Sequence, residues 1–221
     1  MTVNGNPSDA FAADRAAMVE QQLRRRGIHD PRVLEAMGKV PRHEFVAASE
    51  QPEAYSDRPI IIGEQQTTSQ PYIIAAMLQA AEIKPEDRAL EIGAGSGYQT
   101  ALLAELASQV FAVERHPALA DAARQLLERL QYTNVTVVAG DGSLGLPQEA
   151  PFDVIIVSAA APQIPAALLD QLAPEGRLVV PVGDSYQQIL QLARKQADGI
   201  KTTPLEGCRF VPLIGEQGFR E

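Results

Sequence analysis

The pattern of hydrophobic and polar positions divides the chain near residue 83. Before that point apolar residues recur at helical spacing, which predicts a helix over residues 10–27, capped by Gly27, and a second helix that begins at Pro31. A third helix is predicted over residues 71–81. Residues 40–71 are irregular and rich in proline, glycine and polar side chains, and loops of that length are usually functional.

After residue 83 short apolar runs alternate with helical stretches. Runs such as VIIV (154–157) and LVV (178–180) are continuously apolar, as expected for strands that are covered on both faces. This alternation predicts an α/β fold with a doubly wound, mostly parallel, Rossmann-like sheet. The predicted strands are 88–92, 110–114, 135–139, 153–157 and 177–182, with antiparallel additions at 187–192 and 202–212, and the predicted helices are 97–107, 117–130 and 164–172.

No linker interrupts this pattern, so residues 1–221 are predicted to form one domain. Within it, residues 1–9 are expected to be a disordered tail. Residues 10–82 are expected to form a helical cap together with the substrate and active-site segment. Residues 83–221 are then the Rossmann-like core that binds the cofactor.

Composition narrows the class of protein. Hydrophobic residues make up 45% and charged residues 21%, as in globular proteins, and the net charge of −9 argues against a nucleic-acid partner. Neither a membrane-spanning run nor a secretory signal is present in the sequence, so no membrane partner is expected. Cys208 is the only cysteine, which fits a reducing, cytoplasmic location, and the three scattered histidines do not indicate a metal site.

The sharpest local signal is ALEIGAGSGYQTA, residues 89–101, where a strand leads through three glycines into a helix. Gly93, Gly95 and Gly97 follow a G-x-G-x-G spacing, whereas a dinucleotide fingerprint is G-x-G-x-x-G. Glu91 precedes them, where an acid would repel a phosphate but suits a ligand with an ammonium and a sulfonium group. E-x-G-x-G-x-G is the usual first motif of class I methyltransferases, and it predicts S-adenosylmethionine as cofactor, with S-adenosylhomocysteine as its product.

Two further acids follow successive predicted strands. Glu114 ends the strand VFAVE, where a carboxylate can accept hydrogen bonds from both ribose hydroxyls, although an NAD site shares this feature. Asp141, in AGDG with Gly142, follows the next strand, where an acid in such methyltransferases contacts the adenine amino group. Each acid alone is as easily explained as a solvated loop residue, but their positions at consecutive strand ends favour a cofactor site.

The irregular segment carries a more specific resemblance. VPRHEFV (40–46), AYSDRPIIIG (54–63) and QTTSQPY (66–72) resemble the protein-L-isoaspartate O-methyltransferase family. The resemblance continues through 151–165 and 172–183 and ends with RFVPL at 209–213, in order and at family spacing. It implies transfer of a methyl group to the free carboxylate of L-isoaspartyl residues in damaged proteins and peptides, which are then the expected partners.

The resemblance also implies roles for the segment 67–70. Ser69 matches the active-site residue, and the backbone of Thr67, Thr68 and Gln70 is expected to border the cofactor. Thr68 departs from the family pattern, because isoleucine is usual there. Gln65 and Glu175 depart as well, each standing where glycine is common.

Several alternatives remain open at this point. Ser69 can be a turn hydroxyl that bonds its own backbone, and residues 209–213 can bind substrate or simply fill the core. The chain can instead be a relative that methylates ordinary aspartate in one peptide, a non-catalytic cofactor-binding module, or an NAD-dependent oxidoreductase. A carboxylate substrate is ionised at neutral pH, since its reference pKa is about 4, so the reaction needs no strong base.

Overall fold

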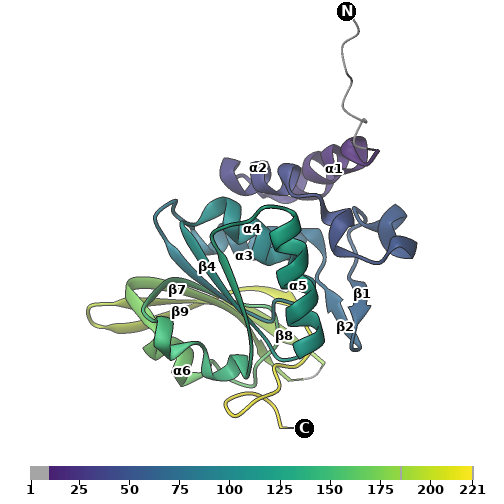
Figure 1. The fold of residues 1–221 in the computed structure, drawn as a ribbon. Helices are drawn as coiled ribbons and strands as arrows, with labels where there is room; N and C mark the ends of the chain where they lie inside the picture. Colours follow the sequence, from purple (N-terminus) through teal and green to yellow (C-terminus); the bar gives the residue numbers. More distant parts are fainter. Residues whose placement is uncertain (1–9, 185, 221) are drawn as a thin grey trace, which may run out of the picture.

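The structure is a computed structural model and describes residues 10–184 and 186–220, so the tail expected at residues 1–9 lies outside the described residues. Its centre is a seven-stranded sheet in the order β5-β4-β3-β6-β7-β8-β9 (Figure 1). The five strands from β5 to β7 are parallel, and β8 and β9 add antiparallel pairs, as predicted. The strands are β3 (Arg88–Ile92), β4 (Gln109–Glu114), β5 (Val135–Ala139), β6 (Phe152–Val157), β7 (Leu172–Gly183), β8 (Gln188–Gln196) and β9 (Gly199–Cys208).

Helices cover both faces of the sheet, which is why most residues of its central strands are apolar. On one face, α3 (Pro71–Ala81), α4 (Tyr98–Leu106) and α5 (Pro117–Arg129) pack with the N-terminal cap over one buried cluster. On the other face, the short helix α6 (Ala166–Asp170) packs over a second cluster. The sequence therefore predicted the doubly wound α/β fold correctly, and the boundaries of α3, β3 and β5 agree to the residue.

The N-terminal cap departs from a regular helix. Its first predicted helix begins as α1 (Ala12–Ala17), widens into the π-helix η1 (Met18–Leu23) and tightens into the 3-10 turn η2 (Arg24–Arg26) before Gly27 ends it with a φ of 97°. Met18 and Leu23 are both fully buried, and a spacing of five residues suits the i→i+5 turn of a π-helix. The second predicted helix is α2 (Pro31–Lys39), whose side-chain cap is Asp30.

The segment 40–70 contains more regular structure than its sequence predicts. Besides the 3-10 turns η3 (Arg42–Phe45) and η4 (Ala48–Glu53), it forms an antiparallel hairpin of β1 (Ile60–Gly63) and β2 (Gln66–Thr68). The turn residues Glu64 and Gln65 have φ values of 47° and 57°. Such turns are usually marked by asparagine and glycine, so the ordinary sequence signal for a hairpin is missing here.

Several predicted boundaries in the C-terminal half were wrong, and the strands predicted over 177–182 and 187–192 are longer, because β7 begins at Leu172 and β8 extends to Gln196. The helix predicted over 164–172 is only five residues long, because the chain joins β7 already at Leu172, which pairs with Phe152. The strand predicted over 202–212 ends at Cys208. Beyond it the chain leaves β8, and Pro212 instead forms a bridge with Ala160 at the end of β6.

Candidate active site at the carboxyl edge of the sheet

The candidate site lies where the order of the strands reverses. The chain runs from β3 outward to β4 and β5, then crosses back to place β6 on the other side of β3. Open α/β sheets bind ligands in the crevice that such a reversal leaves at the carboxyl ends of the strands. Here the backbone N–H of Ser158, just after β6, donates to the carbonyl of Ile92 at 2.8 Å, and that of Gly93 donates to Val113 at 2.8 Å.

The glycine turn follows β3 directly. Gly93, Gly95 and Gly97 have φ values of 87°, 55° and 86°, a region that side chains disfavour. A Cβ atom on Gly95 would lie 3.0 Å from the Ile62 side chain, so the β1–β2 hairpin rests against the turn. Figure 1 shows this hairpin beside α5, and His116 at the start of α5 lies 3.9 Å from the carboxylate of Glu64 in the hairpin turn.

Glu91 is fully buried beneath the first turn of α4. Its carboxylate accepts hydrogen bonds from the Thr100 hydroxyl at 2.5 Å and from the Gln99 amide at 3.1 Å. Burial raises the pKa of Glu91 to about 8, because it disfavours the charged form more strongly than these two donors favour it. A cationic group beside Glu91 would favour the ionised carboxylate.

Glu114 is almost as buried, at 5% exposure, and ends β4 as predicted. Its two carboxylate oxygens accept from the backbone N–H of Gly95 at 2.8 Å and of His116 at 2.9 Å. Glu114 therefore fixes the glycine turn to the start of α5. It also lines the cavity at the strand edge.

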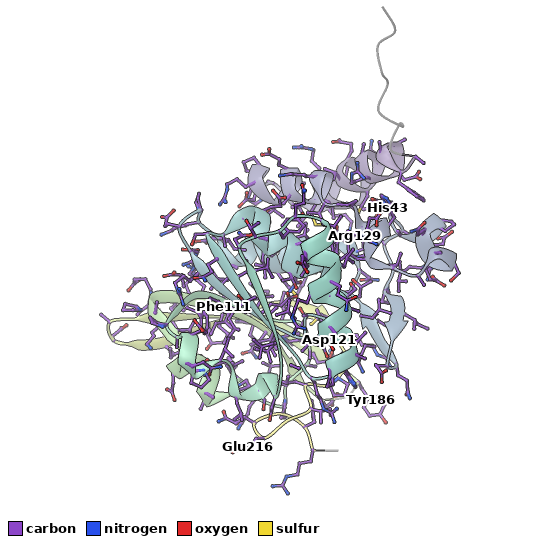
Figure 2. The ribbon with its side chains drawn as sticks, in the orientation of Figure 1. His43, Phe111, Asp121, Arg129, Tyr186 and Glu216 are labelled. Carbon is purple, nitrogen blue, oxygen red and sulfur yellow. The ribbon has the colours of Figure 1, made fainter. Side chains whose placement is uncertain are left out.

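Asp141 follows β5, but its carboxylate is directed to the C-terminal segment. It accepts from the backbone and hydroxyl of Ser143 at 2.9 and 2.7 Å and from the backbone N–H of Glu216 at 2.8 Å. Partial burial opposes ionisation, but these donors prevail and lower the pKa of Asp141 below its ordinary value. Glu216 is labelled in the C-terminal loop of Figure 2.

Gly142, beside Asp141, lies against the end of β3. It has no room for a side chain, because a Cβ atom would lie 2.5 Å from the Ile92 side chain. Gly142 lines the strand-edge cavity directly.

Three hollows meet at this edge. The strand-edge cavity has a volume of about 110 Å³ and contains the glycine turn, Glu114 and Gly142. A small hollow of about 30 Å³ adjoins Glu91 and Ser69. A larger cleft of about 620 Å³ lies between the cap and the end of β9, and Ser69 and Gln70 line it. Thr67 and Ser158 line all three, so they mark the junction.

The segment 67–70 is held at this junction by its polar contacts. The Thr68 hydroxyl turns inward and accepts from Arg42 at 3.3 Å, so it contributes its side chain to the protein interior. Gln70 donates to the carbonyl of Asp57 at 3.3 Å and lines the large cleft, and it does not line the strand-edge cavity. The structure thus brings Thr67, Ser69 and Glu91 together around one point.

One residue of the site, Ser158, was not singled out from the sequence. Ser158 follows β6 directly, and a search of the residues after every predicted strand would have found it, because β6 lies beside β3. Val211 and Pro212, in the segment 209–213 whose role the sequence left open, border both the strand-edge cavity and the large cleft, next to the bridge between Pro212 and Ala160.

The residues present fit S-adenosylmethionine. The glycines and Gly142 leave backbone open to an adenosine, and Glu114 offers carboxylate oxygens at the same cavity. Glu91 supplies a buried acid for a cationic group, and Thr67, Ser69 and Ser158 are among the polar residues that line the hollow beside it. Among residues 10–184 and 186–220, no cluster of histidine, cysteine and acidic side chains could hold a metal ion, and no helix has the length and apolarity to cross a bilayer.

Comparisons with known proteins converge on one family. Residues 13–218 match the family described as protein-L-isoaspartate(D-aspartate) O-methyltransferase. A protein-L-isoaspartate O-methyltransferase of Koribacter versatilis is 57% identical, with 95% of this chain and 94% of that protein aligned. A protein-L-isoaspartate O-methyltransferase 1 from Syntrophobacter fumaroxidans is 56% identical, with 95% of this chain and 98% of that protein aligned.

Solved structures agree with the sequence relatives. The fold is similar to a protein-L-isoaspartate O-methyltransferase structure with a TM-score of 0.83 and 29% identity, over 92% of this chain and 67% of that one. It is also similar to a Plasmodium falciparum structure assigned to the same activity and bound to S-adenosyl-L-homocysteine. There the TM-score is 0.79 and the identity 28%, over 90% of this chain and 98% of that one.

Proposed function

This chain belongs to the protein-L-isoaspartate(D-aspartate) O-methyltransferase family, and on that premise we propose that it repairs damaged proteins and peptides by methylating the free carboxylate of L-isoaspartyl residues. The observation that carries the proposal is the meeting of two unlike hollows at Thr67 and Ser158, with Ser69 lining the larger of the two. One hollow is lined by glycines and an acid, and the other is large enough for a peptide.

The cofactor, when bound, supplies an electrophilic methyl group on a sulfonium. We assign the glycine turn (Gly93, Gly95, Gly97), Glu114 and Gly142 to the adenosine part, since all line the strand-edge cavity or shape it. Glu91 is assigned to the cationic part. The backbone of residues 67–70 borders the cofactor, while Asp141 acts through the C-terminal loop that it holds.

On the substrate side, Ser69 orients the reacting carboxylate. That carboxylate is ionised at neutral pH, so no residue has to remove a proton from it. A neutral hydroxyl can donate one hydrogen bond to an oxygen without neutralising its charge, and correct placement of reacting groups is itself a large part of catalysis. Ser69 thus serves as an orienting donor, and the walls of the cleft exclude water.

The segment 209–213 is proposed to help hold the peptide. Arg209 to Pro212 line the large cleft, and Val211 and Pro212 also reach the strand-edge cavity. Extended peptides can bind through main-chain hydrogen bonds, which tolerate many side chains. That tolerance suits an enzyme that must accept damage in many sequence contexts.

The product is a methyl ester, whose further reaction needs no enzyme. The neighbouring backbone nitrogen attacks the ester carbonyl, methanol leaves, and the resulting succinimide is hydrolysed partly to ordinary aspartate. We further propose that residues 1–221 act as one domain, in the cytoplasm, without a metal or a nucleic-acid partner. The net charge of −9 argues against a nucleic-acid partner, the three scattered histidines argue against a metal site, and the lone cysteine fits the location.

One experiment tests the proposal as a whole. The protein is incubated with S-adenosylmethionine and an isoaspartyl peptide, and the products are followed by mass spectrometry. We expect S-adenosylhomocysteine and a peptide heavier by one methyl group, followed by loss of methanol to the succinimide. Binding of NAD in place of S-adenosylmethionine in a calorimeter, with no methyl transfer, would overturn it.

A further inference from the structure

Arg42, in the turn η3 of the cap, is fully buried. Its guanidinium lies 4.8 Å from the ring of Tyr98, and within residues 10–184 and 186–220 no carboxylate forms an ion pair with it. Burial lowers the pKa of Arg42. A buried cation without a paired acid is expensive, so its retention calls for a reason beyond packing.

The contacts of Arg42 indicate that reason. Its Nη2 donates to the carbonyl of Ser69 at 2.8 Å, its Nη1 to the hydroxyl of Thr68 at 3.3 Å, and its Nε to the carbonyl of Ala54 at 2.7 Å. Two of these three bonds hold the segment that carries the proposed orienting hydroxyl. The guanidinium does not line the cleft, so any effect on substrate passes through that segment.

Arg177 makes a useful contrast, because it is also buried and also binds backbone carbonyls. It donates to Ala81 and Glu82 at 2.9 Å each, but it forms an ion pair with Asp87, which compensates its charge. Arg42 has no such ion-pair partner, because the carboxylate of Asp57, which favours the charged form of Arg42, is itself paired with Arg26; Arg42 lies behind a site for an anionic substrate. In a poorly solvated interior, a charge acts over longer distances than it does in water.

We propose that Arg42 is a positioning residue that fixes the Ser69 segment and lends its unpaired positive charge to the binding of the substrate carboxylate. The proposal rests on the function proposed above and assigns a role at the same site. Thr68 strengthens it, because its hydroxyl gives the guanidinium an acceptor that an apolar side chain would not offer.

The test uses three variants and a matched control. Arg42→Gln removes the positive charge. Arg42→Lys keeps the charge but cannot make all three hydrogen bonds of the guanidinium. Thr68→Val removes one hydrogen-bond acceptor and keeps nearly the same side-chain shape. Arg32→Lys is the control, because Arg32 donates to the carbonyls of Ile83 and Leu106 between the cap and the core, away from the site.

With an isoaspartyl peptide, Arg42→Gln should raise KM about 10- to 100-fold, and Arg42→Lys should recover part of that loss. Thr68→Val should raise KM roughly 2- to 5-fold, the value of one modest hydrogen bond. The Kd for S-adenosylhomocysteine should stay within about 3-fold of the unchanged protein in all of them. Amide hydrogen exchange across residues 64–72 should quicken in the Arg42 variants and remain unchanged in Arg32→Lys.

An equal rise of KM in Arg32→Lys and Arg42→Lys, or unchanged exchange across 64–72, would overturn the proposal. If Arg42→Gln does not fold, Thr68→Val and Arg42→Lys still decide it, since an unchanged KM in both contradicts it. An unmodified protein that binds S-adenosylhomocysteine but does not methylate the peptide would contradict the proposed function instead, while the exchange data would still report on whether Arg42 holds the segment.

Discussion

The two sides of the site differ in the charge that they present. The strand-edge side is acidic, with Glu91 and Glu114 buried at the ends of adjacent strands. The side formed by the cap and the segment 67–70 offers hydroxyls, backed by the buried guanidinium of Arg42. A positively charged methyl donor and a negatively charged carboxylate would each face the side of opposite charge.

This comparison shows how one fold can bring two oppositely charged ligands into contact. The acids are placed by the sheet, because parallel strands end at the same edge and each carries one acid there. The hydroxyls are placed by an irregular segment that the cap holds from behind. Substitutions on the acidic side should therefore weaken cofactor binding. Substitutions on the hydroxyl side should impair the binding or methylation of the peptide.

The largest expected effect is on the hydroxyl side. Ser69→Ala should lower kcat about 10- to 1000-fold, as expected for loss of one oriented donor, and leave the S-adenosylhomocysteine Kd within a few-fold. Steady-state kinetics with an isoaspartyl peptide measures the first and calorimetry the second. Ser56→Ala is the matched control, since its hydroxyl bonds Glu53 at the surface of the same segment. Full activity of Ser69→Ala would mean that the Ser69 hydroxyl only stabilises the local turn and does not orient the substrate.

On the acidic side, Glu114→Ala should weaken S-adenosylhomocysteine binding by roughly 1–3 kcal/mol. It removes a carboxylate from the cavity and leaves the N–H groups of Gly95 and His116 without their acceptor. Calorimetry checks the affinity, and Glu114→Gln, which keeps one acceptor oxygen, should lose less. An unchanged affinity in both variants would show that Glu114 does not contact the cofactor.

A third prediction uses the raised pKa of Glu91. Between pH 4.5 and about 8 the carboxyl would be ionised in the unfolded chain but protonated in the folded one. The free energy of unfolding therefore falls as pH rises through that window, by up to about 1.4 kcal/mol per pH unit. Glu91→Gln removes this pH dependence, because glutamine does not ionise. The free energy of unfolding of the variant, relative to that of the unchanged protein, should therefore increase with pH. Urea unfolding without cofactor at several pH values measures it, and a difference that does not vary with pH would contradict it.

The smallest effect is expected at Asp141. Asp141→Ala should lower the free energy of unfolding by about 1–2 kcal/mol, because it loses the donors Ser143 and Glu216. Since the pKa of Asp141 is lowered in the folded state, its contribution is present near neutral pH and is lost as pH falls through its folded value. Hydrogen exchange should quicken across 214–219, and slow exchange there would show that other contacts hold the loop.

The acidic side could be predicted from the sequence, and the hydroxyl side only through resemblance. Strand periodicity locates Glu91 and Glu114, because the side chains that end parallel strands must gather at one edge. It does not reveal that Asp141 turns toward Glu216, since that contact joins positions 75 residues apart. The sequence also gave no sign of the β1–β2 hairpin, whose turn uses Glu64 and Gln65 at positive φ, or of the burial of Arg42.

The central claim is tested most directly by three peptides that differ at one residue only. One contains isoaspartate, the second aspartate, and the third isoaspartate whose free carboxyl is an amide. Each is incubated with the protein and labelled S-adenosylmethionine, and label in the peptide is counted. The account predicts transfer to the first peptide alone, because only it presents a free carboxylate on the isomerised backbone. Comparable labelling of the aspartyl or the amidated peptide would contradict it.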